Sequence, residues 1–176
     1  MRDQLVYNGF YGIEVIEREI KGRVRVFERL KIRNAVAALV IDSENKVGLV
    51  SQYRPCVNGY MLELPAGLMD KFGLDEREIL IEELYEECGI HEKDIKMISS
   101  TPFANYYPLC GGSDTRLEIY LVFLNCKGAQ KFVNDAEVEF VQWLDRKDIE
   151  ILLRNNKIQD GKTLIGLNHY LYNLQA

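Results

Sequence analysis

The chain has 176 residues, 47% of them hydrophobic and 28% charged, and carries a formal net charge of −5. This composition is typical of a globular protein, and we expect a single domain over residues 1–176. The acidic balance gives no basic surplus for binding nucleic acid through its phosphates. No apolar run approaches the roughly 18 residues that a membrane-spanning helix needs, so we expect no membrane partner.

The cysteines and the N-terminal residues indicate the compartment. The four cysteines show no C-x-x-C spacing, and the first ten residues lack the apolar segment of a secretory signal. We therefore expect reduced thiols in a cytoplasmic protein.

Alternating and β-branched runs predict strands in the first half of the chain. Residues 5–16 (LVYNGFYGIEVI) and 22–32 (GRVRVFERLKI) alternate as strands do, and residues 35–42 and 47–54 form a predicted hairpin around the polar turn SENK. Residues 60–67 (YMLELPAG) follow as a strand that ends in a loop.

A helix is predicted between Asp75 and Gly89. Asp75 and Glu78 have the spacing of a capping box, and glycine is the usual residue just past a helix end. The later segments predict a strand near 95–100, a polar and aromatic loop, two more strands and two helices, at 103–114, 115–125, 137–144, 146–155 and 162–174. Strands, helix, strands and helices in this order predict an α+β fold.

The predicted helix carries an unusual concentration of glutamates. Glu83, Glu86 and Glu87 stand at positions i, i+3 and i+4, so their side chains share one arc, while apolar residues occupy another. These like charges repel one another, and no lysine or arginine follows at i+4 to relieve them. The glutamates are either the solvated side of a surface helix or a platform for a divalent cation. Carboxylates in a tight group are the ligands that Mg²⁺ prefers, which favours the metal platform.

The segment around these glutamates resembles the Nudix box, whose pattern is G-x5-E-x7-R-E-U-x-E-E-x-G-U with U apolar. Gly67 matches the first glycine, and the end of the pattern matches at Glu83, Leu84, Glu86, Glu87, Gly89 and Ile90. Two positions depart, because Glu82 replaces the arginine, and Leu74 replaces the first glutamate after one extra residue. In the family these two residues form a structural ion pair. Both are replaced here, so we expect a repacked loop, as in the UDP-sugar pyrophosphatase branch.

The resemblance extends over most of residues 5 to 172. Residues 47–67 are similar to the segment Q-[YF]-R…E-L-P-A-G of ADP-ribose and other nucleotide-sugar pyrophosphatases, and residues 156–171 to their D-[AG]-K-T segment. Residues 108–119 resemble the S-P-G-G-x-x-E-R loop, whose glutamate falls on Thr115. Threonine cannot serve as a general base, so Asp114, Glu118, Glu137 or Glu86 would have to act instead.

The resemblance implies a Nudix-like α/β/α sandwich with a mixed sheet and N-terminal antiparallel strands. Residues 1–33 would lie at a homodimer interface and residues 34–176 would form the catalytic core. The implied metal ligands for Mg²⁺, with Mn²⁺ as an alternative, are Ala66, Glu83, Glu86 and Glu87, and Glu86 and Glu83 would be catalytic. The implied substrate-binding residues are Gln52, Arg54, Glu63, Gly111, Gly112, Asp114 and Arg116.

Individual side chains allow more than one interpretation. Arg54 has a planar fork that can pair with two diphosphate oxygens, or it is a surface arginine after a strand. Aromatic residues of the N-terminus and the 103–114 loop stack on a base or simply pack, and these are Phe10, Tyr11, Phe103, Tyr106 and Tyr107. We interpret His91 and His169 as structural, because no partner for nucleophilic catalysis accompanies them.

Two classes of function remain open. The first is Mg²⁺-dependent hydrolysis of a nucleoside diphosphate sugar, with ADP-ribose or an ADP-sugar as the first substrate class and a UDP- or GDP-sugar as the alternative. The second is a non-catalytic Nudix-like module that binds a nucleotide or a protein. Retention of three repelling carboxylates on one arc favours the enzyme.

Overall fold

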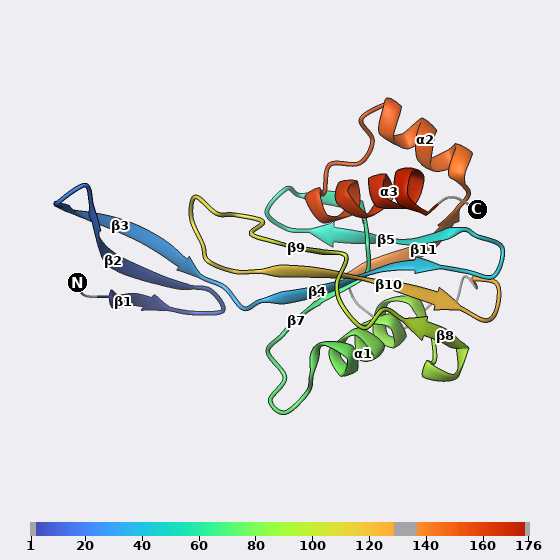
Figure 1. Cartoon of the computed structure of the whole chain (residues 1–176), viewed down its shortest axis with the longest axis horizontal. Helices are drawn as coiled ribbons and strands as arrows, with labels where there is room; N and C mark the ends of the chain where they lie inside the picture. Colours follow the sequence, from blue (N-terminus) through green and yellow to red (C-terminus); the bar gives the residue numbers. More distant parts are fainter. Residues whose placement is uncertain (1–2, 129–136, 175–176) are drawn as a thin grey trace.

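The computed structural model describes residues 3–128 and 137–174, which form a large mixed sheet with helices on both faces. Helix α1 (Glu76–Cys88) covers one face, whereas α2 (Arg146–Arg154) and α3 (Gly161–Asn173) cover the other (Figure 1). A small N-terminal sheet projects from one end of this sandwich. The α+β prediction and the expected α/β/α layering are confirmed.

The N-terminal sheet has three antiparallel strands in the order β1-β2-β3. They are β1 (Asp3–Asn8), β2 (Gly12–Ile20) and β3 (Arg23–Lys31). The prediction of one strand over residues 5–16 is wrong, because the chain reverses at residues 9–11, where the Gly9 amide donates to the Tyr11 carbonyl at 3.1 Å. Alternation continues on both sides of this turn, which hides it in the sequence.

Five strands of the large sheet pair in the order β11-β5-β4-β10-β8. Three short strands also belong to it: β6 pairs with β5, β7 with β4, and β9 with β10. Strands β4 and β10 pair in parallel, and every other pair between described strands of this sheet is antiparallel. The bounds are β4 (Ala35–Ile41), β5 (Val47–Arg54), β6 (Gly59–Glu63), β7 (Ala66–Leu68), β8 (Ile95–Ile98), β9 (Ala104–Tyr106), β10 (Leu117–Leu124) and β11 (Val138–Leu144). A short 3₁₀ helix (Glu92–Asp94) precedes β8.

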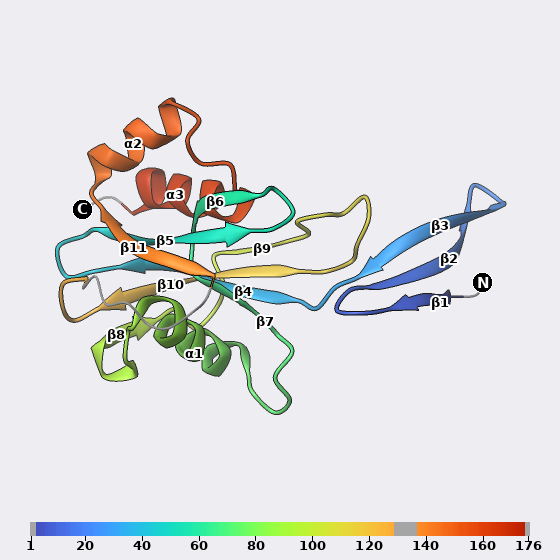
Figure 2. The ribbon, with the colours of Figure 1, turned by 180° about the vertical axis from the view of Figure 1, so that it is seen from behind.

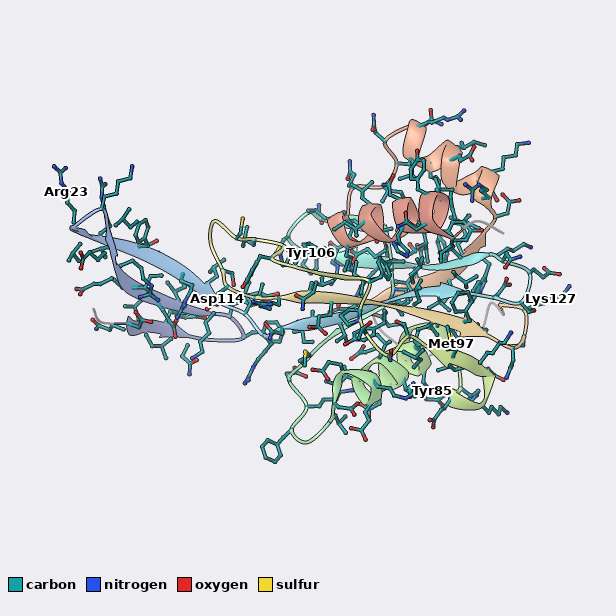
Figure 3. All side chains as sticks on the ribbon, in the orientation of Figure 1. Arg23, Tyr85, Met97, Tyr106, Asp114 and Lys127 are labelled. Carbon is teal, nitrogen blue, oxygen red and sulfur yellow. The ribbon has the colours of Figure 1, made fainter. Side chains whose placement is uncertain are left out.

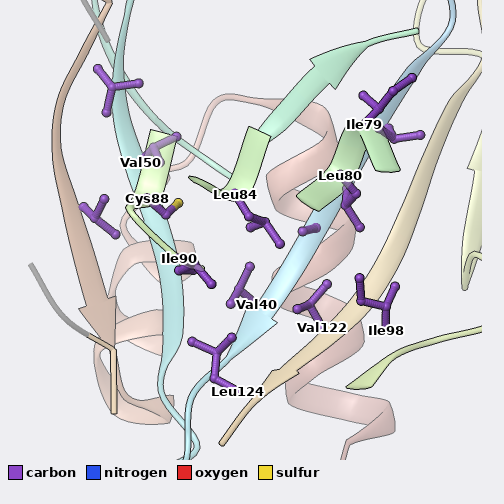
Figure 4. Close-up of a cluster of buried hydrophobic side chains, with 14 residues drawn as sticks. Val40, Val50, Ile79, Leu80, Leu84, Cys88, Ile90, Ile98, Val122 and Leu124 are labelled. Atoms are coloured by element: carbon purple, nitrogen blue, oxygen red, sulfur yellow. The ribbon is translucent and has the colours of Figure 1, made fainter. Parts of the chain in front are cut away.

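Strand β4 is buried on both faces, which explains its unbroken apolar sequence. Val36, Ala38 and Val40 face the core under α1, where Figure 4 shows Val40, and the alternate residues face the core under α2 and α3. Leu80 and Leu84 of α1 pack into the first of these cores. The two cores hold the sheet rigidly between the helices, and its strand ends therefore present side chains at fixed positions.

Proline divides the predicted strand over residues 60–67. Strand β6 pairs with β5 and stops at Glu63, and β7 begins at Ala66 and pairs with β4. Pro65 has no N–H for a ladder bond, but its carbonyl accepts from the Ala38 amide at 2.9 Å. The break at Pro65 moves the chain from its pairing with β5 to a pairing with β4, and there β7 contacts α1.

Further expectations from the sequence can be compared with this fold. The hairpin at SENK, the strands near 95–100, 115–125 and 137–144, and all three helices are confirmed. The 103–114 loop contains the short strand β9, which its sequence did not reveal. All four cysteines are free thiols. None of the helices within residues 3–128 and 137–174 is long and apolar enough to cross a membrane.

Candidate metal and diphosphate site

Helix α1 begins and ends where its sequence predicts. The Asp75 side chain accepts from the Glu78 amide at 2.8 Å, and the Glu78 side chain accepts from the Asp75 amide at 2.9 Å. At the other end Gly89 adopts the left-handed conformation with φ of 66°. The last turn contains no basic residue, although carboxylates near a helix C-terminus face the negative end of its dipole. The acidic side chains of this turn therefore need a positive partner from elsewhere.

The three predicted metal ligands differ in environment. Glu87 is only 4% exposed and accepts from the Ala66 amide at 3.1 Å, whereas the side chain of Glu86 is 56% exposed. Glu83 lies against the backbone of Gly67, where a Cβ atom would be 2.2 Å from its Cδ. The three glutamates share one arc of α1, as their i, i+3 and i+4 spacing predicts, but Glu87 is buried against β7 whereas Glu86 faces solvent. Glycine at position 67 is required for the approach of Glu83 to β7.

Lys71 supplies the positive charge that the helix lacks. Its Nζ lies 2.7 Å from Glu82, 3.9 Å from Glu83 and 3.8 Å from Glu86. The hydrogen bond to Glu82, together with the surrounding carboxylates, raises the pKa of Lys71 above its usual value. No lysine or arginine follows at i+4 on the helix, as the sequence shows, but the loop residue Lys71 relieves the repulsion between the glutamates. The sequence shows no partner along the helix because the partner comes from the β7–α1 loop.

The two departures from the Nudix pattern also acquire a structural explanation. Leu74, at the position of the first glutamate, packs against the core under α1. Glu82, at the position of the arginine, pairs with Lys71. The loop is repacked as expected, but a loop–helix ion pair is retained with its polarity reversed: the base now comes from the loop and the acid from the helix.

The chemistry of these side chains fits a divalent cation, whereas their arrangement includes a resident ammonium group. Carboxylate oxygens are the ligands that Mg²⁺ and Mn²⁺ prefer. Within residues 3–128 and 137–174, however, no three acidic, histidine or cysteine side chains are gathered in a way that would hold a metal ion. Glu83 and Glu86 instead share Lys71. Binding of a cation by them would require this ammonium group to move.

Arg54, the predicted diphosphate ligand, belongs to a partly buried ion-pair network. Its Nε and Nη2 donate to the two carboxylate oxygens of Glu63 at 2.7 and 2.6 Å. Glu63 also accepts from Lys162, which lies 3.1 Å from Asp160. The negative charge of Glu87 further raises the pKa of Arg54, after the larger effect of the Glu63 hydrogen bond. Arg54 therefore lies close enough to α1 to interact electrostatically with the carboxylate of Glu87.

The same network fixes the backbone that leads to Ala66. The Thr163 hydroxyl donates to Asp160 at 2.6 Å and accepts from the Leu64 amide at 2.8 Å. In Figure 2, β6 lies between β5 and the N-terminal end of α3. The segment DGKT, which the sequence identified only as a helix start, thus holds the β6–β7 connection, and Lys162 is a site-supporting residue that sequence reasoning missed. The Thr163 and Asp160 spacing was its only signal.

The predicted substrate-binding residues form two separate groups. Gln52 is buried on β5 beside Arg54 and Glu63. The remaining four, Gly111, Gly112, Asp114 and Arg116, lie on or directly after the β9–β10 loop, and Asp114 lies next to the N-terminal sheet in Figure 3. The Gly112 carbonyl accepts from the Leu30 amide at 2.7 Å, and Asp114 pairs with Arg29 at 2.8 Å. These contacts join the loop to β3.

A cleft of about 640 Å³ lies between the N-terminal sheet and the sandwich. Asp114, Asn34 and Met69 line it from the sandwich side, and basic residues line it from the N-terminal side, including Arg29, Lys31 and Arg33. A neighbouring pocket of about 280 Å³ is lined by Phe10 and Tyr11 together with Leu68 of β7 and Asp70 of the loop after it. Both N-terminal aromatic residues therefore line a pocket close to the Lys71 loop.

The loop position Thr115 and the candidate general base Glu118 lie in different environments. The Thr115 hydroxyl donates to the Arg33 carbonyl at 2.7 Å, so this residue is structural. Glu118 accepts from Tyr120, which packs on the core under α1, so its carboxylate faces the same side of the sheet as α1. In the sheet register, Glu118 pairs with Val36, and Val36 pairs with Gly67. Glu118 therefore lies about 10 Å across the sheet from Gly67, at two strand spacings.

The two histidines and the loop residues Phe103 and Tyr107 contact neighbouring side chains. His169 stacks on Phe103 with ring centroids 4.0 Å apart, and burial lowers its pKa. His91 contacts Tyr85 at 5.1 Å between centroids. Tyr107 is held by Arg116, whose Nη2 donates to its hydroxyl at 2.6 Å.

Comparison with known proteins places this geometry in context. A family model described as the NUDIX domain matches residues 31–165. The methanol dehydrogenase activator of Bacillus methanolicus is 30% identical over 153 residues, which cover 84% of this chain and 77% of that protein. ADP-ribose pyrophosphatase of Bacillus subtilis (strain 168) is 25% identical over 149 residues, with the same two coverages. Nudix hydrolase 14, chloroplastic, of Arabidopsis thaliana is 32% identical over 96 residues, covering 49% of this chain and 31% of that protein.

Proposed function

The chain belongs to the Nudix family, and from that premise we propose that it is a Mg²⁺-dependent pyrophosphatase of nucleoside diphosphate sugars. ADP-ribose or an ADP-sugar is the first substrate class, and a UDP- or GDP-sugar is the alternative. The similarity to a protein named ADP-ribose pyrophosphatase supports the first class. The observation that carries the proposal is the placement of two α1 carboxylates against the β7 backbone, with Glu83 on Gly67 and Glu87 on Ala66.

The metal would be held by Glu83, Glu86, Glu87 and the Ala66 carbonyl, as Mg²⁺ or Mn²⁺. When bound, the cation supplies charge neutralisation for the diphosphate, which otherwise repels an attacking water. Charge neutralisation and positioning are the main contributions that a protein makes to phosphoryl transfer. Glu83 would approach the metal beside Gly67, because the absence of a Cβ atom there leaves space for its carboxylate.

Arg54 and Glu86 have distinct roles in this proposal. The Glu63 pair uses Nε and Nη2 of Arg54, so Nη1 is the edge of the guanidinium that is directed to a diphosphate oxygen. Glu86, the most exposed of the three glutamates, accepts a proton from the attacking water on a carboxylate oxygen. The water oxygen then bonds to phosphorus as the bridging P–O bond breaks, which releases a nucleoside monophosphate and a sugar phosphate.

The test is hydrolysis of a substrate panel in the presence of Mg²⁺. ADP-ribose, UDP-glucose and GDP-mannose are incubated with the protein, and the release of monophosphate is followed. Glu86→Gln and Glu87→Gln should each lower kcat by at least about 10²-fold, as removal of one electrostatic group at a reacting centre does. The matched control is Glu92→Gln, an exposed glutamate of the 3₁₀ helix. Full activity in both α1 variants would contradict the assignment.

We also propose that the N-terminal sheet pairs with a second copy of the chain. Large apolar side chains of this sheet and its turn are exposed, namely Leu5, Val6, Tyr7, Phe10, Ile20, Val24, Val26 and Phe27. Exposed apolar residues gathered on one element are typical of an interaction surface, and twofold dimers are the commonest oligomers. A homodimer would bring the cleft at the β9–β10 loop next to the partner copy.

A non-catalytic role is the second candidate function. A relative at 30% identity is named as an activator of a dehydrogenase, and Lys71 lies among the carboxylates that the enzyme would need for its metal. In this case the chain would bind a nucleotide or a protein partner without turnover. Absence of monophosphate release on every member of the panel, at high protein concentration, would favour this candidate.

A further inference from the structure

Lys71 is placed where a cation would compensate the carboxylates of α1. Its ammonium group lies within 4 Å of a carboxylate oxygen of each of Glu82, Glu83 and Glu86. Glu82 is the direct hydrogen-bond partner, and the other two contacts are longer. The ammonium group is therefore hydrogen-bonded to Glu82 and lies at nearly equal distances from the carboxylates of Glu83 and Glu86.

The segment that carries Lys71 is anchored to the core at both ends, and the Lys71–Glu82 hydrogen bond ties its tip to α1. The Met69 amide donates to the Asn34 carbonyl at 2.8 Å, and Leu74 packs into the core under α1. Between these anchors Phe72 is fully exposed, and Gly73 has φ of +86°, a conformation that glycine adopts readily. Release of Lys71 from Glu82 would therefore leave both anchors of the segment in place.

We propose that Lys71 is a tethered counter-ion that competes with the divalent cation for Glu83 and Glu86, and that Glu82 holds it in position. This inference rests on the proposed metal site. A divalent cation needs carboxylate oxygens at about 2.1 Å for Mg²⁺, and a positive charge within 4 Å of two of its ligands opposes its binding. The Lys71–Glu82 pair thus lowers the affinity for the metal. In the metal-free protein it reduces the repulsion between the glutamates of α1.

The competition has a direct consequence for metal binding. Substitution of Lys71 by glutamine removes the competing charge and leaves all three proposed carboxylate ligands unchanged. The affinity for Mn²⁺ should rise about tenfold, which corresponds to about 1.4 kcal/mol. Lys71→Arg retains the competing positive charge, because arginine is always protonated. This variant should therefore bind Mn²⁺ within about twofold of the wild-type protein. Lys147→Gln on α2, across the sheet, is the matched control for loss of one lysine and should have no effect.

Two measurements test the inference without reference to turnover. Free Mn²⁺ is quantified by electron paramagnetic resonance during titration at low ionic strength, where charge interactions are least screened. Urea unfolding in the presence of chelator should show that metal-free Lys71→Gln is less stable than the wild type, because the helix loses its counter-ion. Added Mn²⁺ should then stabilise Lys71→Gln more than it stabilises the wild type.

The outcomes separate this inference from the proposed function. Unchanged or weaker Mn²⁺ affinity in Lys71→Gln, in a protein that hydrolyses the substrate panel, would overturn the role of Lys71 and leave the pyrophosphatase intact. Equal gains in Lys71→Gln and Lys147→Gln would also overturn it, because the effect would then reflect net charge alone. Failure of the wild type and both Lys71 variants to bind Mn²⁺ would overturn the metal site and the inference together.

Discussion

Glu63 offers the sharpest test of what holds the β6–β7 connection in place. Its side chain is 3% exposed and is bonded by Arg54 from one side and by Lys162 from the other. Glu63→Gln keeps the size of the side chain and removes its charge, leaving the Lys162 ammonium buried with Asp160 at 3.1 Å as its remaining partner. Breaking a buried ion pair costs about 3–5 kcal/mol, and the surviving Asp160 contact places this variant near the lower limit.

The expected loss is therefore about 3 kcal/mol of unfolding free energy, which for a chain of this size lowers Tm by about 6–12 °C. Urea unfolding gives the free energy, provided that the m-value is unchanged, and calorimetry gives Tm. The double variant Glu63→Met/Lys162→Met removes both buried charges and should be less destabilised than the sum of the single variants. A loss below about 1 kcal/mol in Glu63→Gln, or strict additivity in the double variant, would refute this account of the network.

The same group predicts a pH dependence with a defined sign. Burial opposes ionisation of Glu63, but the hydrogen bonds and charges of Arg54 and Lys162 outweigh it and hold its pKa below the usual 4.5. A group whose pKa is lowered by folding stabilises the protein fully above its unfolded-state pKa and loses this contribution as the pH falls through the folded-state pKa. The wild type should therefore lose stability below about pH 4.5 more steeply than Glu63→Gln, and parallel pH profiles would contradict the shift.

Three further predictions concern separate features. Gly67→Ala places a Cβ atom 2.2 Å from Cδ of Glu83 and should displace this carboxylate. We expect kcat to fall by about 10²-fold, with the helix content measured by circular dichroism unchanged. A variant with wild-type kcat would show that Glu83 can move aside without loss of activity. Asp75→Ala removes the N-cap of α1 and should cost about 1 kcal/mol in urea unfolding, whereas an unchanged midpoint would mean that the cap is dispensable. Val26→Glu should convert a light-scattering mass near twice 20.4 kDa to the mass of a monomer, with Arg25→Gln as the control; a wild-type monomer would contradict the dimer proposal.

Local patterns predicted the elements whose signals lie within one stretch of chain. Helix α1 was bounded correctly because its capping box and its C-terminal glycine are adjacent to it in sequence. Strand β4 was recognised because burial on both faces makes it continuously apolar. The β1–β2 turn was missed because alternation resumes after it, and β9 because three residues in a polar loop carry no period.

The site was predicted less completely because its main contacts join distant segments. Glu63 and Lys162 are separated by 99 positions, and their meeting depends on how α3 packs on β6, which no local pattern specifies. The burial of Glu87 depends in a similar way on where β7 resumes after Pro65. Sequence spacing correctly indicated which carboxylates share one helix, whereas their different exposures follow from the strand beside them.

The Lys71 loop shows why a departure from a family pattern needs a three-dimensional interpretation. Considered position by position, Leu74 and Glu82 each remove one partner of an ion pair, which suggests that the pair is lost. In the folded chain the extra residue after Gly67 lengthens the loop, Leu74 turns into the core, and Lys71 reaches Glu82. The interaction between loop and helix is thus preserved while the residues that make it have changed. Because the basic residue now lies on the loop, its charge reaches Glu83 and Glu86 as well, and a structural ion pair becomes coupled to the proposed metal ligands.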